Sequence, residues 1–292
     1  MENEPRGRPS KTFEDQELEE LLEEDDSQNQ KQMAEQLGCT RMTISRRLKA
    51  LGKRQIQGKW VPHKLSDRQQ ENRKLTSGIL LERQERKSFL HQIITGDEKW
   101  VYLDNPKRKK IWATPGTSAS TPKPTPRPDR FGKKTMLCVF WDQRGVLYWE
   151  LLLPGQTVTA DRYQQQLREL NRILPLKRPE WDKRREKSAR VVLLHDNASP
   201  HIAISVKEVL RELQWETLPH PLYSPDLAPS DYHLFRSMQH GLSGQHFPEH
   251  EDVRKWLVEW FDTKGEKFFK DGIRQLPEKW RLCVASDGAY FD

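Results

Sequence analysis

Val191-Val192-Leu193-Leu194-His195-Asp196-Asn197 is a short apolar run that ends abruptly in an aspartate. Four consecutive apolar residues, two of them valines, leave no polar face, so the run predicts a strand that is buried on both sides. A carboxylate at the end of such a strand lies where the core meets a cleft. Asp196 is therefore the first candidate for a functional acid.

Two other aspartates stand on separate elements. Asp231 falls in the first turn of a helix that we expect to begin near residue 230, and thirty-four residues separate it from Asp196. Asp97 begins another strand-like segment in the sequence TGDEKW (95–100). Carboxylates are the hard oxygen ligands that divalent cations prefer. Two such ions, about 3.5–4 Å apart, can stabilise the attacking and leaving oxygens of a phosphodiester.

Each acid also has a simpler interpretation. Aspartates at strand ends and helix starts are common turn and cap residues, so only the combination of three predicts a site. Asp226 rivals Asp231 as the third acid, although its place in a proline-containing loop also suits a turn. Glu98 is next to Asp97, but it points to the opposite face of the strand.

Zinc is disfavoured as the metal. His195 and His201 flank Asp196, but no cysteine pair or third nearby histidine joins them. Three widely spaced cysteines suggest a reducing compartment in which they serve as small buried apolar residues. They are Cys39, Cys138 and Cys283.

The composition favours a soluble chain with a polyanionic partner. Of 292 residues, 34% are hydrophobic, and 10 Trp, 10 Phe and 6 Tyr can build a sizeable core. The net charge of +7 and the pI of about 9.2 suit a nucleic acid, although solubility alone would also account for them. An N-terminal apolar leader and an apolar run of about 18 residues are both absent, so we expect a soluble intracellular protein.

The first fifth of the chain predicts a DNA-binding module. Apolar positions indicate three short helices at 13–22, 28–37 and 41–51, with a tight break at Gly38 that is typical of a helix-turn-helix. The third helix is basic and suits a recognition helix that faces phosphates; the alternative is a bundle with a solvated basic face. Its candidate contacts are Arg41, Arg46, Arg47 and Lys49.

Basic or aromatic connections lie on both sides of this module. Arg6 and Arg8, in the sequence RGRP, suit a narrow minor groove, although a basic tail is an equal alternative. The linker after the module contains Trp60, Pro62 and His63, which suit a contact between domains or subunits, although a local contact with the next helix is the alternative. A capping box at residues 66–69 opens a helix that we expect to continue to about residue 94.

The order of elements in the remainder predicts the fold class. Strands are expected at 95–103, 134–142, 146–153, 190–194 and 215–218, with helices at 159–174, at 200–213 and from about 230. This order matches an α/β, RNase H-like mixed sheet flanked by helices. Its first and fourth strands would lie side by side at the centre, so that Asp97 and Asp196 converge and Asp231 joins them from the closing helix.

Six motifs resemble those of mariner transposases, and together they span nearly the whole chain. They are WVPHKL (60–65), TGDEKW (95–100), FGKKTMLCVFWD (131–142), HDNASPH (195–201), YSPDLAPSDYHLF (223–235) and CVASDGAYF (283–291). The spacing between Asp196 and Asp231 also fits the mariner pattern. Relatives whose third acid is a glutamate differ in this respect.

The resemblance implies a nuclear, metal-dependent DNA transposase. Asp97, Asp196 and Asp231 would be both the catalytic residues and the ligands of two Mg²⁺ or Mn²⁺ ions. The enzyme would cut double-stranded DNA at the terminal inverted repeats of a transposon and join the 3′ ends to target DNA at TA sites. It would work as a homodimer in a paired-end complex, with no role for a membrane. Tyr223 would contact DNA near the site.

The resemblance also suggests a domain plan. It has a basic linker (1–12), a helix-turn-helix domain (13–52), a second linker (53–65) and an RNase H-like catalytic domain (66–292) with an inserted arm (105–130). In the family this arm and the WVPHKL segment reach the partner subunit. Mariner transposases carry two helix-turn-helix units, whereas this sequence begins at about the linker between them. We therefore expect only the second unit here.

Two other functions remain open from the sequence. A transposase-derived DNA-binding protein could keep the recognition helix with reduced or no transposition activity. A nuclease that cuts RNA–DNA hybrids would share the RNase H-like fold, but the helix-turn-helix argues against it.

Overall fold

The computed structural model describes residues 13, 15–24, 30–51, 63–106, 132–179 and 191–291. The chain forms two compact units, Met1–Trp60 and Val61–Asp292, and each is described by itself. Several predicted features lie outside the described residues: Arg6 and Arg8, the linker residues Trp60 and Pro62, and all but the first two residues of the arm at 105–130. Within the described residues, no helix is both long and apolar enough to cross a membrane.

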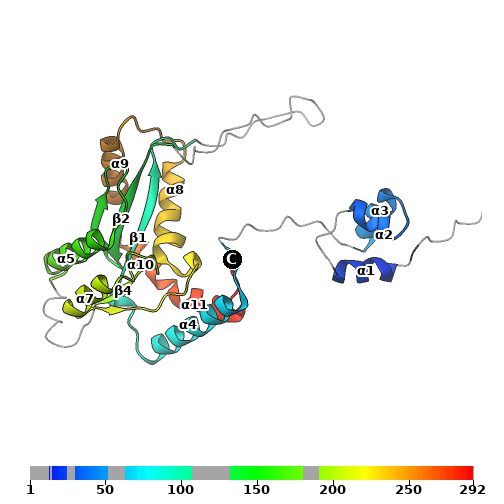
Figure 1. The fold of residues 1–292 in the computed structure, drawn as a ribbon, viewed down its shortest axis with the longest axis horizontal. Coiled ribbons are helices and arrows are strands. Elements are labelled where there is room, and N and C mark those ends of the chain that lie inside the picture. Colours follow the sequence, from blue (N-terminus) through cyan, green and yellow to red (C-terminus); the bar gives the residue numbers. More distant parts are fainter. Residues whose placement is uncertain are drawn as a thin grey trace, which may run out of the picture. The chain divides into compact units, whose positions relative to one another are not determined.

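The smaller unit is the predicted three-helix module, with α1 (Asp15–Glu24), α2 (Gln30–Gln36) and α3 (Arg41–Ala50) (Figure 1). The Thr40 hydroxyl accepts a hydrogen bond from the backbone N–H of Thr43 and caps α3. Gly38 has φ +60° in the turn before it, a conformation that favours glycine. The core contains Phe13, Leu18, Met33, Ala34 and Ile44.

The larger unit is built on a five-stranded mixed sheet. Its strands are β1 (Ile93–Tyr102), β2 (Lys134–Asp142), β3 (Gly145–Leu151), β4 (Val192–Leu194) and β5 (Glu216–Thr217). Their order is β3-β2-β1-β4-β5, with β1 antiparallel to β2 and parallel to β4. The predicted fold class is therefore confirmed, and the first and fourth strands are neighbours at the centre.

Helices cover both faces of this sheet (Figure 1). On one face, α5 (Ala160–Lys177) and α7 (Ile204–Glu212) pack against Ile94 and Phe140. The other face, which carries Ile93, Val139 and Trp141, packs against the C-terminal part of the chain. That part comprises the π-helical turn η4 (Ser230–Phe235), α8 (Arg236–Leu242), α9 (His250–Asp262), α10 (Glu266–Arg274) and α11 (Leu276–Ala285).

The long helix expected to reach residue 94 is shorter than predicted. The helix α4 (Asp67–Arg86) begins with the predicted capping box but ends at Arg86, and a 3-10 turn (Leu90–Gln92) leads into β1. Leu75 and Ile79 of this helix are exposed. Arg73, Ser77 and Leu80 are buried instead. α4 packs against α11. The buried face of α4 includes Arg73, so its guanidinium lies inside the protein.

A pair of glycine substitutions tests the packing of the central strand. A Cβ on Gly96 would lie 2.4 Å from Cε1 of Phe140, whereas a Cβ on Gly78, in α4, would have no atom within 4 Å. We expect Gly96→Ala to lower the free energy of unfolding by about 1–3 kcal/mol through overpacking. Gly78→Ala should raise it by up to about 1 kcal/mol, because alanine favours a helix. Denaturant unfolding measures both, and equal effects would contradict the packing of Phe140 on Gly96.

Candidate active site

The sheet places Asp97 and Asp196 at the same edge. The parallel pairing of β1 with β4 ends with Thr95 opposite Leu194, and each aspartate lies two residues beyond that pair. Asp97 is still inside β1, where it is opposite Val139 of β2, and its carboxylate accepts a hydrogen bond of 2.7 Å from the backbone N–H of Glu98. The two acids are therefore fixed by the central strands.

Asp231 joins them from the turn η4, which contacts β1. The indole N–H of Trp141, on β2, donates a buried hydrogen bond of 3.0 Å to the hydroxyl of Ser230. This bond anchors the start of η4 to the sheet, one residue before Asp231. An open groove of about 530 Å³ runs beside Asp231 and is also lined by Lys99, Phe235 and Arg236.

The three carboxylates influence one another electrostatically. Burial, together with the charges of Asp231, Glu98 and Asp196, raises the pKa of Asp97 well above its usual value. Burial likewise raises the pKa of Asp231 to about 6, with Asp196 adding to the rise and Lys99 opposing it. Clustered carboxylates that resist ionisation call for a compensating cation.

Asp196 differs from the other two acids because it has strong partners. Its Oδ1 accepts hydrogen bonds from the backbone N–H of Ala198 at 2.9 Å and from Nδ1 of His201 at 2.7 Å. Burial opposes its charge, but these bonds outweigh burial and lower the pKa of Asp196. The other ring nitrogen of His201 lies 3.3 Å from Oε1 of Glu98.

His201 is thus held between two carboxylates. Burial would lower its pKa, but the hydrogen bonds to Asp196 and Glu98 raise it to about 10. His195, by contrast, bonds through Nδ1 to the hydroxyl of Tyr163 at 2.8 Å, and burial lowers its pKa to about 3. The two histidines flanking Asp196 therefore have separate partners.

The three carboxylates suit a hard divalent cation, although their side chains are not arranged around a common metal position. Among the residues that the structure describes, no group of three or more His, Cys, Asp and Glu side chains has the geometry to hold a metal ion. Asp97 and Asp196 use carboxylate oxygens to accept backbone hydrogen bonds instead. Three oxygen donors on rigid elements, two of them with raised pKa values, nevertheless fit Mg²⁺ or Mn²⁺ better than zinc.

The rival acid Asp226 has a structural role. Its carboxylate receives a bidentate ion pair from Arg73 at 2.8 and 2.5 Å. Arg73 is fully buried and also donates to Ser224 Oγ at 2.7 Å and to the carbonyl of Gly288 at 2.8 Å. This cluster joins α4, the loop before Asp231 and the C-terminal segment. The order of charges along the chain does not indicate this cluster.

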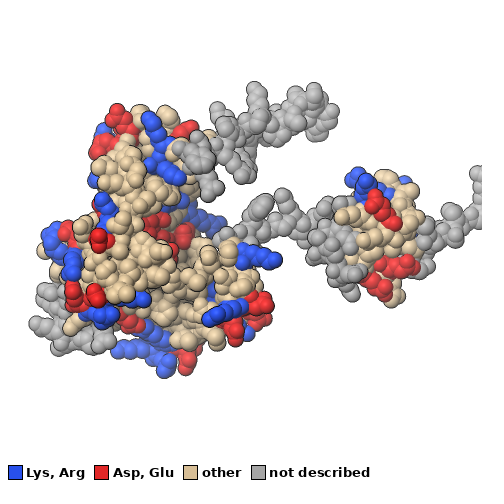
Figure 2. All heavy atoms as spheres, in the orientation of Figure 1, with Lys and Arg blue, Asp and Glu red and all other residues tan. Residues whose placement is uncertain are grey.

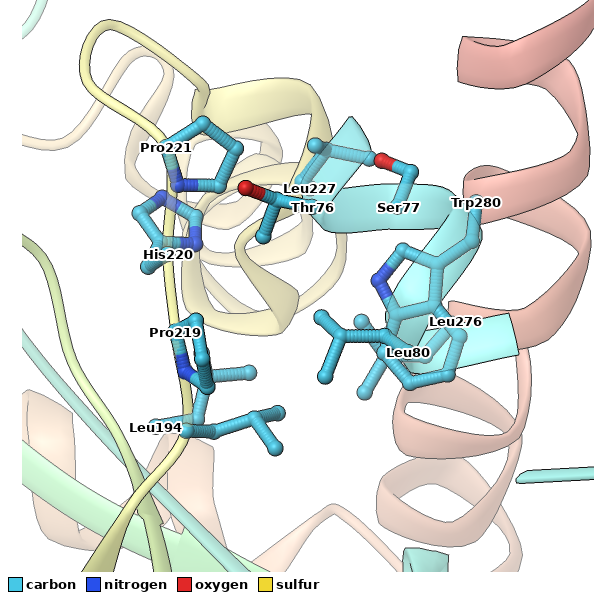
Figure 3. Close-up of a pocket in the computed structure, with 11 residues that line it drawn as sticks. Thr76, Ser77, Leu80, Leu194, Pro219, His220, Pro221, Leu227, Leu276 and Trp280 are labelled. Atoms are coloured by element: carbon cyan, nitrogen blue, oxygen red, sulfur yellow. The ribbon is translucent and has the colours of Figure 1, made fainter. Parts of the chain in front are cut away.

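A small cavity lies beside Leu194, the last residue of β4, and is not a substrate site. Figure 3 shows Leu194, Leu80 and Trp280 pointing into it, with His220 on its rim. Its volume of about 10 Å³ is at most that of one water molecule. The amide of Asn197 donates a 2.6 Å hydrogen bond to the His220 carbonyl, which closes the loop after Asp196 onto this wall.

Two residues predicted to contact DNA or a partner subunit lie together in the larger unit. The ring of Tyr223 stacks on that of His63 at 4.0 Å between centroids. Tyr223 is about half exposed and has φ +53°, a strained value for a non-glycine residue. The hydroxyl of Tyr290 donates a 2.7 Å hydrogen bond to its carbonyl and helps to hold this conformation.

The basic face predicted on α3 divides into two sets. Arg41, Arg46 and Lys49 are exposed. Arg47 instead forms an ion pair with Asp15 and lies over the ring of Phe13 at 5.3 Å, so it holds α1 against α3. In Figure 2 acidic side chains of this unit are seen over α1, and basic ones are seen over the opposite side beside further acidic ones.

Substitution of Asp226 and substitution of Asp231 should change the stability of the protein in opposite directions. Asp226→Ala leaves Arg73 buried without its partner, and we expect the free energy of unfolding to fall by about 3–5 kcal/mol. Asp231→Asn removes a carboxylate that burial and Asp196 destabilise, and in a chelating buffer it should raise stability by about 1 kcal/mol. Denaturant unfolding distinguishes the two. A stabilising Asp226→Ala would contradict the structural role.

The chain is similar to known transposases. A family model described as Transposase (partial DDE domain) matches residues 102–184. The Mariner Mos1 transposase of Drosophila mauritiana is 56% identical over 292 residues, which is 100% of this chain and 83% of that protein.

Solved structures agree over the same span. Crystal structures of the Mos1 mariner paired end complex, one with Mn and one with Mg, each match with a TM-score of 0.88 and 57% identity. The Mos1 Strand Transfer Complex matches with a TM-score of 0.87 and 56% identity. In all three, the match covers 100% of this chain and 83% of the other.

Proposed function

Because this chain belongs to the mariner family of transposases, we propose that it cuts and joins DNA with Asp97, Asp196 and Asp231 as its catalytic residues. The observation that carries the proposal is the convergence of these three acids from β1, the end of β4 and η4 on one mutually repelling cluster. Family membership makes it a DNA transposase. Asp226 and Glu98 suit this role less well, because Arg73 and His201 hold their carboxylates.

The same three carboxylates are the proposed metal ligands. Two Mg²⁺ or Mn²⁺ ions held there would activate the attacking water or hydroxyl and stabilise the leaving 3′-oxygen. Asp97 and Asp231 gain most from a cation, since burial and like charges disfavour their ionised forms. The Mos1 paired end complexes with Mn and with Mg support a divalent ion.

The groove beside Asp231 is the proposed path of the DNA strand. Lys99 and Arg236 supply positive charge along it, and His240 lies further along its wall. Cations at these positions can hold phosphates next to the three acids without taking part in the chemistry. The half-exposed ring of Tyr223 remains a predicted DNA contact at the neighbouring loop.

The partners and setting of the reaction are further parts of the proposal. Transposon inverted repeats would be the DNA that is cut, and TA sites the target. The Mos1 paired end complex and Strand Transfer Complex support assembly on two ends, and so a homodimer, with end joining as the outcome. The nucleus is the compartment that such a substrate requires. A DNA-binding protein without activity is disfavoured, because all three acids are present and converge.

Replacing each acid by asparagine tests the catalytic assignment. We expect Asp97→Asn, Asp196→Asn and Asp231→Asn each to lower the rate of end cleavage at least about a hundredfold, because a metal ligand contributes several kcal/mol to the transition state. DNA binding in a chelating buffer should be unchanged. The measurement is nicking of a matching inverted-repeat duplex with Mg²⁺. Full activity in any of the three would remove that residue from the site.

Salt dependence tests the two sets of basic residues on α3. We expect the plot of log affinity against log salt to become less steep, by about one unit of slope, in each of Arg41→Ala, Arg46→Ala and Lys49→Ala. Each variant removes one phosphate contact. Arg47→Ala should mainly lower the melting temperature of the module, because it breaks the ion pair with Asp15. Fluorescence anisotropy with a labelled duplex, beside thermal unfolding, separates these effects. Unchanged slopes in all three would argue against the recognition helix.

A further inference from the structure

We propose that His201 is the positioning residue of the metal site: it fixes the carboxylate of Asp196 so that one chosen oxygen, Oδ2, faces the cation. The inference rests on the proposed function of Asp196 as a metal ligand.

The hydrogen bonds around Asp196 are asymmetric. Nδ1 of His201, at 2.7 Å, and the backbone N–H of Ala198, at 2.9 Å, both donate to the same oxygen, Oδ1. Two donors on one oxygen fix the plane of the carboxylate. The second oxygen, Oδ2, is then the one directed to a cation, and we infer that Asp196 binds metal through that atom alone.

The ring that makes this bond cannot easily rotate. His201 is 2% exposed, and its centroid lies 4.1 Å from that of Tyr163. The backbone N–H of His201 donates to the carbonyl of Ala198 at 2.8 Å. The same turn therefore carries both donors to Asp196, which are the ring of His201 and the backbone N–H of Ala198. A buried ring in a fixed turn keeps its partner in place better than an exposed one.

Glu98 fixes the orientation of the ring from its far side. Its Oε1 lies 3.3 Å from Nε2 of His201. Glu98 follows Asp97 directly but lies on the other face of β1, toward α5, as predicted from the alternation of a strand. The two adjacent acids thus have different tasks, since Asp97 faces the cation and Glu98 holds the histidine that orients Asp196.

This arrangement is a carboxylate–histidine–carboxylate chain that ends on a ligand. Partners of metal ligands commonly set the orientation of the ligand, and their loss typically weakens metal binding about 10- to 100-fold. A purely structural histidine, in contrast, would affect folding without changing metal affinity in the folded protein. Metal affinity is therefore the measurement that separates the two roles.

Two amide variants test which ring nitrogen matters. In His201→Asn the amide nitrogen takes the place of Nδ1 and can still donate to Asp196, whereas in His201→Gln it reaches the place of Nε2, toward Glu98. We expect His201→Gln to weaken Mn²⁺ binding to the full chain about tenfold or more. His201→Asn should weaken it less, because it keeps the donor to Asp196 and loses only the contact with Glu98. Mn²⁺ titration by electron paramagnetic resonance, without DNA, gives the dissociation constants.

Tyr163→Phe is the matched control from the same aromatic cluster. It removes the hydroxyl that bonds His195 but keeps the ring against His201, so Mn²⁺ affinity should not change. Equal weakening by His201→Asn and His201→Gln would overturn the inference, as would wild-type affinity in His201→Gln or a loss in Tyr163→Phe. Thermal unfolding checks that each variant is folded.

Two more variants complete the test. If a His201 variant does not fold, Glu98→Gln decides, because it keeps the ring buried but removes the charge that orients it. Weaker Mn²⁺ binding there supports the inference, and an unchanged constant overturns it. Asp196→Asn separates this inference from the proposed function. If Asp196→Asn itself binds Mn²⁺ like wild type, the proposed metal site is wrong, whereas a loss there beside intact His201→Gln rejects only the role of His201.

Discussion

The parallel pairing of β1 with β4 is the contact on which the site depends. Ile93 and Ile94 of β1 lie opposite Val192 and Leu193 of β4, and all four side chains are fully buried between the two helical layers. The strands come from distant parts of the sequence, yet their register places two acids at one edge. A one-residue slip would move each of these side chains to the opposite helical layer and disrupt the packing of both layers. The geometry of the site is therefore fixed by the core.

The carboxylate cluster lowers stability, and the fold offsets this cost elsewhere. Asp97 and Asp231 are buried among like charges. Trp141 packs beneath the site and binds Ser230, and the buried Arg73–Asp226 pair fixes the approach to the same turn. Strain and repulsion at functional sites are commonly tolerated in this way. Binding of a cation here relieves the repulsion among these carboxylates and so stabilises the folded protein.

Much of this architecture could be predicted from local pattern, and the failures have identifiable causes. The bounds of β2 follow from its apolar sequence and from the turn after Asp142, and β4 from four consecutive apolar residues. The end of α4 was missed because Phe89, Leu90 and Ile93 continue an apolar pattern while the backbone changes to a strand. Such a change depends on sheet partners that lie about a hundred residues away.

Interactions between charged side chains were the least predictable feature of the site. His201 is five residues from Asp196, but its second partner, Glu98, comes from β1, so only the strand order brings the three together. Arg47 belongs by sequence to a basic DNA-facing set, yet it pairs with Asp15. The sequence thus shows which residues carry a charge. The topology decides which of these charged groups pair with one another and which remain available to bind DNA or metal. Asp97 and Asp231 remain for a cation because burial and neighbouring acids disfavour their charged forms, and Lys99 offsets this only in part at Asp231.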